Sequence, residues 1–316
     1  MSRMGVSLAA LTLALAGLVG QAQASTEDKD VARLVSFGGM CVSCELSGRK
    51  LTGAKFTGAN FAKAILIGSD LRGAAFYGSN FASADLTRAD LRGAEMRGAN
   101  FASANFTDAR LSGIESSGAN FQNATLIRVD LSSSELNGAN MVGANLTKAN
   151  LSNAEMSGAN LVQVNARDAN FRNAELNAAN LINGRFDGAD FRNAEFTGAQ
   201  MRGAVFNGAD FRGADLSNAI LGGADLSGAK GLDQDQLDEA CGDSGTRLPR
   251  GLSLKSCHGS PRNIRVIVDF GRAQAEAARA QAEAQRAQAE AERASAAAWA
   301  APKPPKAPAP PKPPKY

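Results

Sequence analysis

The chain has 316 residues, with 34 Lys and Arg against 31 Asp and Glu, one His and four Cys. Its small net charge of +3 and its dispersed basic residues argue against a nucleic-acid-binding protein. The single histidine, His258, excludes histidine-based catalysis elsewhere, and no glycine-rich phosphate loop follows a strand and opens a helix. The sequence therefore predicts no enzyme, no cofactor and no metal site.

Residues 1–24 have the pattern of a secretory signal peptide. Arg3 precedes the apolar run Val6–Val19, and Ala22-Gln23-Ala24 forms a small-residue cleavage site. The run is short for a membrane-spanning helix, and no later segment is long and apolar enough to be one. No cysteine follows the run directly, which argues against a lipid anchor. We therefore expect cleavage after Ala24 and a periplasmic or secreted protein.

Residues 25–45 are predicted to form an N-terminal cap on the repeats that follow. Val31, Leu34 and Val35 would lie on one face of a short helix. Such a helix could cover the first repeat, whose strand backbone would otherwise invite end-to-end aggregation.

Residues 46–230 repeat a five-residue unit without insertion or deletion. Every fifth position from Leu46 to Leu226 is Leu, Phe or Met, except Ser116 and Ala166, and the position two before it is nearly always Ala. A period of five fits neither a helix nor a strand, so we expect the chain to turn a corner after each unit. Four sides then close a 20-residue coil, and side chains of one type recur at steps of 20, as in Phe61, Phe81, Phe101 and Phe121.

Units such as Ala-Asn-Phe-Ala-Ser at 99–103, Ala-Asp-Leu-Arg-Gly at 89–93 and Ala-Asn-Leu-Thr-Lys at 144–148 resemble those of the pentapeptide-repeat family. The resemblance covers residues 46–230 and implies an all-β solenoid, a right-handed four-sided β-helix. Coils about 4.8 Å apart would make a rod on the order of 45 Å long. The best-known role in the family is that of an acidic rod that occupies the DNA site of a topoisomerase. Residues 46–230 carry nearly equal numbers of basic and acidic residues, and the predicted export argues further against that role here.

Residues 231–270 are predicted to cap the other end. Asp233 is a plausible helix N-cap before a helix over 234–240, and Leu232 and Leu237 could plug the last coil. The segment is similar to the one that follows the repeats in many exported bacterial members of the family, which favours a bacterial periplasmic setting.

The four cysteines allow three pairings. The rod places Cys41 and Cys44 at one end and Cys241 and Cys257 at the other, so that only pairs within each end could be bridged. Redox or metal chemistry is the alternative, but no histidine lies near Cys41-x-x-Cys44 and no βαβ pattern surrounds it. We therefore predict two structural disulfides in an oxidising compartment.

The outward positions form columns at steps of 20. An asparagine column runs from Asn60 to Asn180, and we interpret it as structural, since Asn tolerates corners and stacked amides can bond one another. A glutamate column runs from Glu95 to Glu195, and arginine lies three residues before some of its members. The column members without this arginine form a candidate binding stripe for a cation or a basic partner: Glu115, Glu135 and Glu155. The alternative is neutral drift of charges on a solvated face.

The C-terminal residues form two further segments. Residues 271–300 repeat Arg-Ala-Gln-Ala-Glu-Ala and predict an Ala-rich, heptad-like helix, either solvated alone or associating as a homo-oligomer. Residues 301–316 form a Pro- and Lys-rich tail that is expected to be extended, a spacer or a ligand for an anionic polymer, a membrane surface or a proline-binding module. Its candidate contacts are Lys303, Lys306, Lys312 and Lys315.

Together these segments predict an exported, non-catalytic scaffold, tethered or assembled through its C-terminal helix and tail. Its partner would be a protein or a cell-envelope polymer. The alternative is an inhibitor that binds its partner through one face of the rod.

Overall fold

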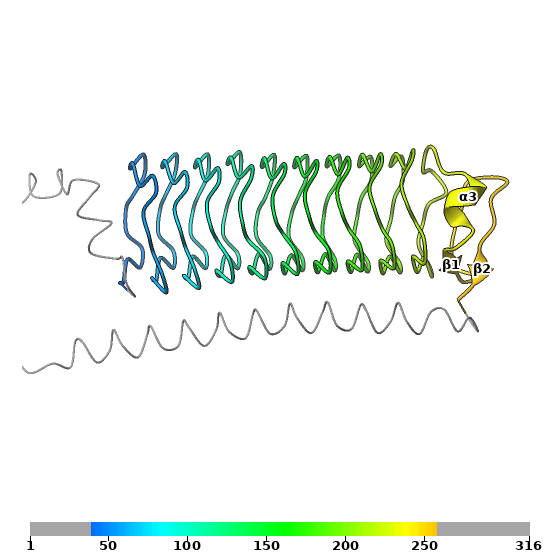
Figure 1. Ribbon diagram of the computed structural model, residues 1–316, viewed down its shortest axis with the longest axis horizontal. Coiled ribbons are helices and arrows are strands. Elements are labelled where there is room, and N and C mark those ends of the chain that lie inside the picture. The colour runs from blue at the N-terminus through cyan, green and yellow to red at the C-terminus, as the bar shows by residue number, and fades with distance from the viewer. Residues whose placement is uncertain (1–38, 258–316) are drawn as a thin grey trace, which may run out of the picture.

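The computed structural model describes residues 39–257, which form a rod of stacked coils (Figure 1). Parallel β-bridges join every fifth residue to the one 20 positions later, from Met40–Asn60 through to Asp210–Lys230. Four bridges per coil, five residues apart, give the coil four sides. The predicted four-sided solenoid with a 20-residue coil is therefore confirmed.

Each side consists of a short bridge followed by a tight turn. The turn begins at the inward residue, which we call the centre, and closes when the backbone NH three residues later donates to its carbonyl, as from Ala64 to Phe61 at 3.0 Å. The third turn residue has a positive φ, for example 59° at Lys63 and 58° at Ser83, as a type II turn requires. The asparagines of the Asn60 column were expected at these corners, which is wrong, since they lie at the bridges, one residue before the centre. Other asparagines, such as Asn123 and Asn153, do occupy the third turn position.

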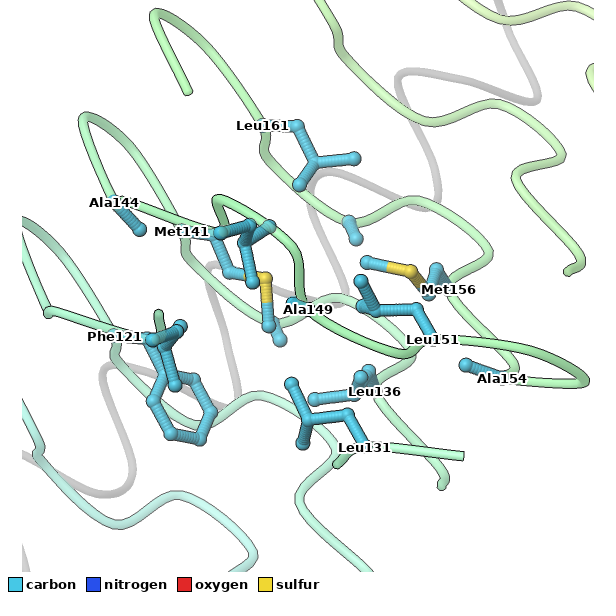
Figure 2. Packing of buried hydrophobic residues seen from close by; sticks show 14 of the residues in the cluster. Phe121, Leu131, Leu136, Met141, Ala144, Ala149, Leu151, Ala154, Met156 and Leu161 are labelled. Carbon is cyan, nitrogen blue, oxygen red and sulfur yellow. The ribbon is translucent and has the colours of Figure 1, made fainter. Parts of the chain in front are cut away.

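The core is a set of columns of inward side chains. Centres and the alanines two residues before them are almost fully buried along the rod. In one column the ring centroids of Phe61 and Phe81 lie 4.7 Å apart, and those of Phe81 and Phe101 lie 5.1 Å apart. Figure 2 shows this column as it changes from Phe121 to Met141 and Leu161. The predicted stacking of like side chains at steps of 20 is therefore confirmed.

In two repeat units the large and the small inward side chains have changed places, and both remain fully buried. Between Leu46 and Leu226, Ser116 and Ala166 are the two centres that are not Leu, Phe or Met, and each follows a branched residue at the position usually held by Ala. The pairs are Ile114 with Ser116 and Val164 with Ala166, and all four side chains are fully buried. The Ser116 hydroxyl donates to the Glu135 carbonyl at 3.2 Å, which satisfies it inside the core.

The stack begins at Met40, which bridges to Asn60, six residues before the predicted start. Cys41 is an inward centre with 6% of its surface exposed, and Cys44 takes the position of the usual Ala. Residues 40–45 are therefore part of the first coil rather than of a separate cap. The rest of the predicted cap, residues 25–38, lies outside the described residues.

The C-terminal cap continues the ladder before closing it. Ile220 bridges to Cys241 and Asp225 to Arg247, so these last two spacings exceed 20 residues. Helix α3, Gln234–Leu237, lies in the stretch of chain that precedes Cys241. Asp233 is its N-cap, as predicted, and forms a capping box with Gln236. Leu237 is fully buried against the last coil, and the helix is shorter than the predicted 234–240.

Two short parallel strands finish the cap, β1 at Cys241–Gly242 and β2 at Lys255–Ser256 (Figure 1). Within residues 39–257, no helix is long and apolar enough to cross a membrane. The predicted signal peptide, Ala-rich helix and Pro/Lys tail all fall outside this range.

Candidate interaction faces

The outer surface of the rod has four flat faces, one for each side of the coil. Each face shows the residue just before every centre and the residue just after it. In chain order we name them by their bridge residues: the Asn face (Asn60 and each twentieth residue to Asn180), the mixed face (Ile65, Asp85, Asn105 and onward), the Arg–Asp face (Asp70, Asp90 and onward) and the Glu face (Glu95 and each twentieth residue to Glu195, then Asp215).

The Glu face carries an unbroken row of carboxylates. Its glutamates are joined by consecutive bridges from Glu95 to Glu195, and Asp215 extends the row. Along these coils Arg97 is the one basic residue on the face, and the third residue of each turn is uncharged at both borders of the face. Four arginines lie just beyond one border, on the Arg–Asp face: Arg92, Arg172, Arg192 and Arg212. The rod is close to neutral overall, yet one of its four faces is strongly acidic.

Two members of the predicted stripe have a basic neighbour. The Arg97 guanidinium lies 2.8 Å from a carboxylate oxygen of Glu115 and 4.0 Å from one of Glu135. The expectation that these two carboxylates lack an arginine is therefore wrong. Glu155 accepts a hydrogen bond from the Asn137 amide at 3.2 Å. The Glu face as a whole retains a large negative excess, because its row of seven carboxylates contains one arginine.

The expected arginine–glutamate pairs do not form, because a corner separates the two side chains. Arg92 instead binds Asp90, two residues earlier on the same face, with Nε and Nη2 at 2.8 and 2.7 Å from the two carboxylate oxygens. Arg72 binds Asp70 in the same way and lowers the pKa of that carboxyl to about 2. In the middle of the face serine replaces arginine, and the Ser132 hydroxyl donates to Asp130 at 2.8 Å.

The Asn face is a hydrogen-bonded ladder. The Asn80 amide donates to Asn60 at 3.2 Å, and Asn100 donates to Asn80 at 3.1 Å. The same Asn60 oxygen accepts from the backbone NH of Ala62 at 3.1 Å, so that the side chain also holds the start of the turn. The predicted bonding between stacked amides is confirmed, and these hydrogen bonds join adjacent coils.

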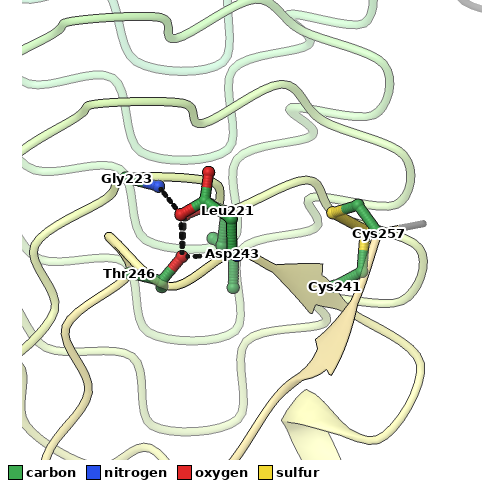
Figure 3. The surroundings of a disulfide bond; sticks show 6 residues. All are labelled: Leu221, Gly223, Cys241, Asp243, Thr246 and Cys257. Carbon is green, nitrogen blue, oxygen red and sulfur yellow. Dashed lines mark hydrogen bonds between the residues drawn. A yellow bond between two sulfur atoms is a disulfide. The ribbon is translucent and has the colours of Figure 1, made fainter.

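All four cysteines are paired as predicted, Cys41 with Cys44 and Cys241 with Cys257. Their Cα atoms lie 5.2 and 4.9 Å apart, respectively. The second disulfide joins β1 to the residue that follows β2 (Figure 3). In residues 39–257 no group of His, Cys, Asp and Glu is placed to hold a metal ion.

A carboxylate also helps to hold this end of the rod. Asp243 accepts from the backbone NH groups of Gly223 at 2.8 Å and Gly245 at 2.9 Å, and from the Thr246 hydroxyl (Figure 3). Hydrogen bonds to the charged form lower the pKa of Asp243. The candidate tail contacts Lys303, Lys306, Lys312 and Lys315 lie outside the described residues, as does His258.

Comparison with known proteins agrees with this architecture. The family profile described as pentapeptide repeats matches residues 44–82, 154–193 and 194–230, and a second profile, a pentapeptide repeat region, matches residues 84–161. No curated protein matches the chain.

Among solved structures, the chain is similar to HetL, a pentapeptide repeat protein involved in heterocyst differentiation regulation from the cyanobacterium Nostoc sp. strain PCC 7120. The two are 26% identical over 60% of this chain and 89% of HetL, with a TM-score of 0.38. It is also similar to QnrB1, a plasmid-mediated fluoroquinolone resistance protein, with 20% identity over 73% of this chain and 98% of QnrB1 and a TM-score of 0.45. A pentapeptide repeat protein of the Arabidopsis thaliana thylakoid lumen is 24% identical over 48% of this chain and 87% of its own, with a TM-score of 0.20.

The family profiles together cover almost all of the rod. Proteins of this family form right-handed quadrilateral β-helices and act in general as structural or interaction proteins. The chain belongs to the pentapeptide repeat family.

Proposed function

We propose that this protein is an exported, non-catalytic scaffold that binds a cell-envelope partner through the rod surface and the C-terminal helix and tail. The observation that carries the proposal is the separation of charge on the rod. Negative side chains are gathered on the Glu face, whereas the Arg–Asp face neutralises its carboxylates locally, as Arg92 does for Asp90. A single-sign row on a rigid surface attracts and orients a partner of opposite charge.

The rod supplies a rigid support for this row. Adjacent coils are joined on every side by backbone hydrogen bonds such as Phe101 NH to the Asn120 carbonyl at 2.7 Å. The spacing of the carboxylates along the Glu face is therefore fixed by the backbone, at about 4.8 Å per coil. A basic segment of a partner laid along the rod would meet one carboxylate in each coil.

The tail has the opposite charge and a different target. Its four lysines, without an acidic residue among 301–316, suit an anionic envelope polymer or membrane surface. Tethering through the tail and recognition through the Glu face are compatible, since they use different parts of the chain. The alternative function, a partner-directed inhibitor, would use the Glu face alone.

The Glu face does not favour DNA mimicry. A duplex presents phosphates on two strands around its axis. The carboxylates here form one row on one side of the rod, and the Arg–Asp face beside it carries arginines towards both of its ends.

A capture experiment from an envelope extract separates the two functions. The baits are the chain from Ser25, the same chain without residues 271–316, and a Glu115→Gln, Glu135→Gln, Glu155→Gln variant. A matched control removes three carboxylates from the mixed face, with Glu45→Gln, Asp85→Asn and Asp225→Asn.

Partners lost with the tail, or lost both with the tail and in the Glu-face variant, support the tethered scaffold. Partners lost only in the Glu-face variant support inhibition through the rod. If all four baits capture the same proteins, neither surface is a binding site and the proposed function is wrong. Binding through either surface should weaken with added salt.

A further inference from the structure

The outside of the rod is apolar at its N-terminal end. Within residues 39–257, the large apolar side chains that are well exposed all lie in the first two coils, at the blue end of the rod in Figure 1. We call them the collar: Met40, exposed to 57%, Val42 to 46%, Ile65 to 37% and Tyr77 to 37%. Single exposed apolar residues are common, but a group confined to one end of an otherwise polar rod marks a surface that is covered.

The collar extends around three sides of the rod. Met40 and Val42 lie on the Asn face, Ile65 bridges to Glu45 on the mixed face, and Tyr77 lies on the Glu face. The solenoid itself does not require apolar residues here, because the same columns carry Asn, Ala, Thr and Ser in later coils. A surface that bends around three sides fits a segment of chain wrapped across it better than the flat side of a second rod.

The same end of the rod is positively charged. In the first two coils, residues 40–79, five basic residues stand against the two acidic residues Glu45 and Asp70, and Lys50, Lys55 and Lys63 among them are exposed. A partner for this end should therefore combine apolar and acidic residues.

We infer that residues 25–38 of the same chain bind back onto the collar. This segment places an acidic group before an apolar one: Glu27, Asp28 and Asp30, then Val31, Leu34, Val35 and Phe37. The apolar group matches the collar, and the three carboxylates exceed Lys29 and Arg33 by one negative charge, opposite in sign to the lysines at this end of the rod.

The position of the segment favours this occupant over any other. The Gly39 carbonyl accepts from Asn60 NH at 2.9 Å, which fixes the chain on the Asn face directly beside Met40. Extended at about 3.3 Å per residue, residues 25–38 could reach roughly 45 Å, which is enough to pass around the coil. Because the segment is covalently attached, its effective concentration at the collar is high. The segment would then cover the outside of the first two coils, and not only the open end of the first coil as the sequence pattern suggested.

Tryptic cleavage can test this contact, because the segment contains Lys29 and Arg33. The protein is the chain from Ser25 with its disulfides intact, and mass spectrometry follows the release of its N-terminal peptides. The collar variant carries Met40→Asn, Val42→Ala and Ile65→Asn, residues that the same three columns use in other coils. A control variant carries Val142→Ala and Val162→Ala in the column of Val42, far from the collar.

We expect cleavage at Lys29 and Arg33 to be at least about tenfold faster in the collar variant than in the parent and the control, since protection follows the closed population. Circular dichroism should show the same β-rich rod in all three. Equal cleavage in the parent and the collar variant, whether fast or slow, would refute the contact. A dimer of the parent that the collar variant abolishes, with residues 25–38 open in both, would also refute it, by showing that a second copy covers the collar.

Discussion

The exchanged pair Ile114 and Ser116 gives a sharp test of how the core is packed. Ile114→Ala alone should leave a cavity and cost about 2–5 kcal/mol. Ser116→Leu alone should overpack a site with no exposed surface and cost about 1–3 kcal/mol. The double variant restores the usual Ala-x-Leu pattern of the other coils, and it should lie within about 1.5 kcal/mol of the parent.

The measurement is denaturant unfolding of the parent, both single variants and the double variant. A long repeat rod need not unfold in two states, so midpoints should be compared by two probes before free energies are derived. We expect a favourable interaction energy of about 2 kcal/mol or more between the two substitutions. The pair Val164 and Ala166, treated in the same way, is an independent repeat of the test.

Additive losses would refute the reasoning. If the double variant is destabilised by the sum of the single variants, Ile114 does not occupy the space that the Ser116 centre leaves.

Further measurements test the core, the disulfides, the Arg–Asp pairs and the proposed tail. Phe101→Ala removes a ring stacked between two others and should cost about 3–5 kcal/mol, whereas outward Ala102→Ser should cost little, and equal denaturation midpoints would contradict the inward assignment. The unreduced protein should show no alkylatable thiol, and two or more would contradict the disulfides. Because Arg72 lowers the pKa of Asp70 to about 2, their pair stabilises the fold above about pH 4, and this stabilisation is lost as the pH falls towards 2. Asp70→Asn should therefore remove part of the loss of stability between pH 4 and pH 2. An unchanged dependence of stability on pH in this variant would count against the pair. Trp299 should emit as a water-exposed indole, and mild proteolysis should remove residues after about 270 and leave the rod, so that a blue-shifted emission would contradict tethering through a free tail.

The fold was predictable because one short period dictates it. A centre at every fifth residue left only a chain that turns after each unit, and the columns at steps of 20 fixed the number of sides. The early start of the rod was also present in the sequence. Cys41 falls on the five-residue register of the centres and Cys44 on that of the alanines, but neither belongs to the usual residue types.

The ion pairs could not be read from spacing alone. Arg92 and Glu95 are three residues apart, which suggests a contact, but the turn at Gly93 places them on different faces. Arg97 and Glu115 are far apart in sequence and meet because the next coil lies beside the first. The glutamate column itself was visible at steps of 20, whereas the local pairing of Asp90 with Arg92, which leaves the Glu face as the acidic side, was not.

The face on which a residue lies depends on how many five-residue units precede it in the rod. Removing one whole coil of 20 residues would shorten the rod by one step and leave every later residue on its original face. Removing a single five-residue unit would keep every centre inward, yet it would turn everything after it by a quarter of the circumference. The core would tolerate both changes, whereas the Glu face would survive only the first. A row that stays on one face from Glu95 to Glu195 therefore depends on a coil count that the hydrophobic core does not itself enforce.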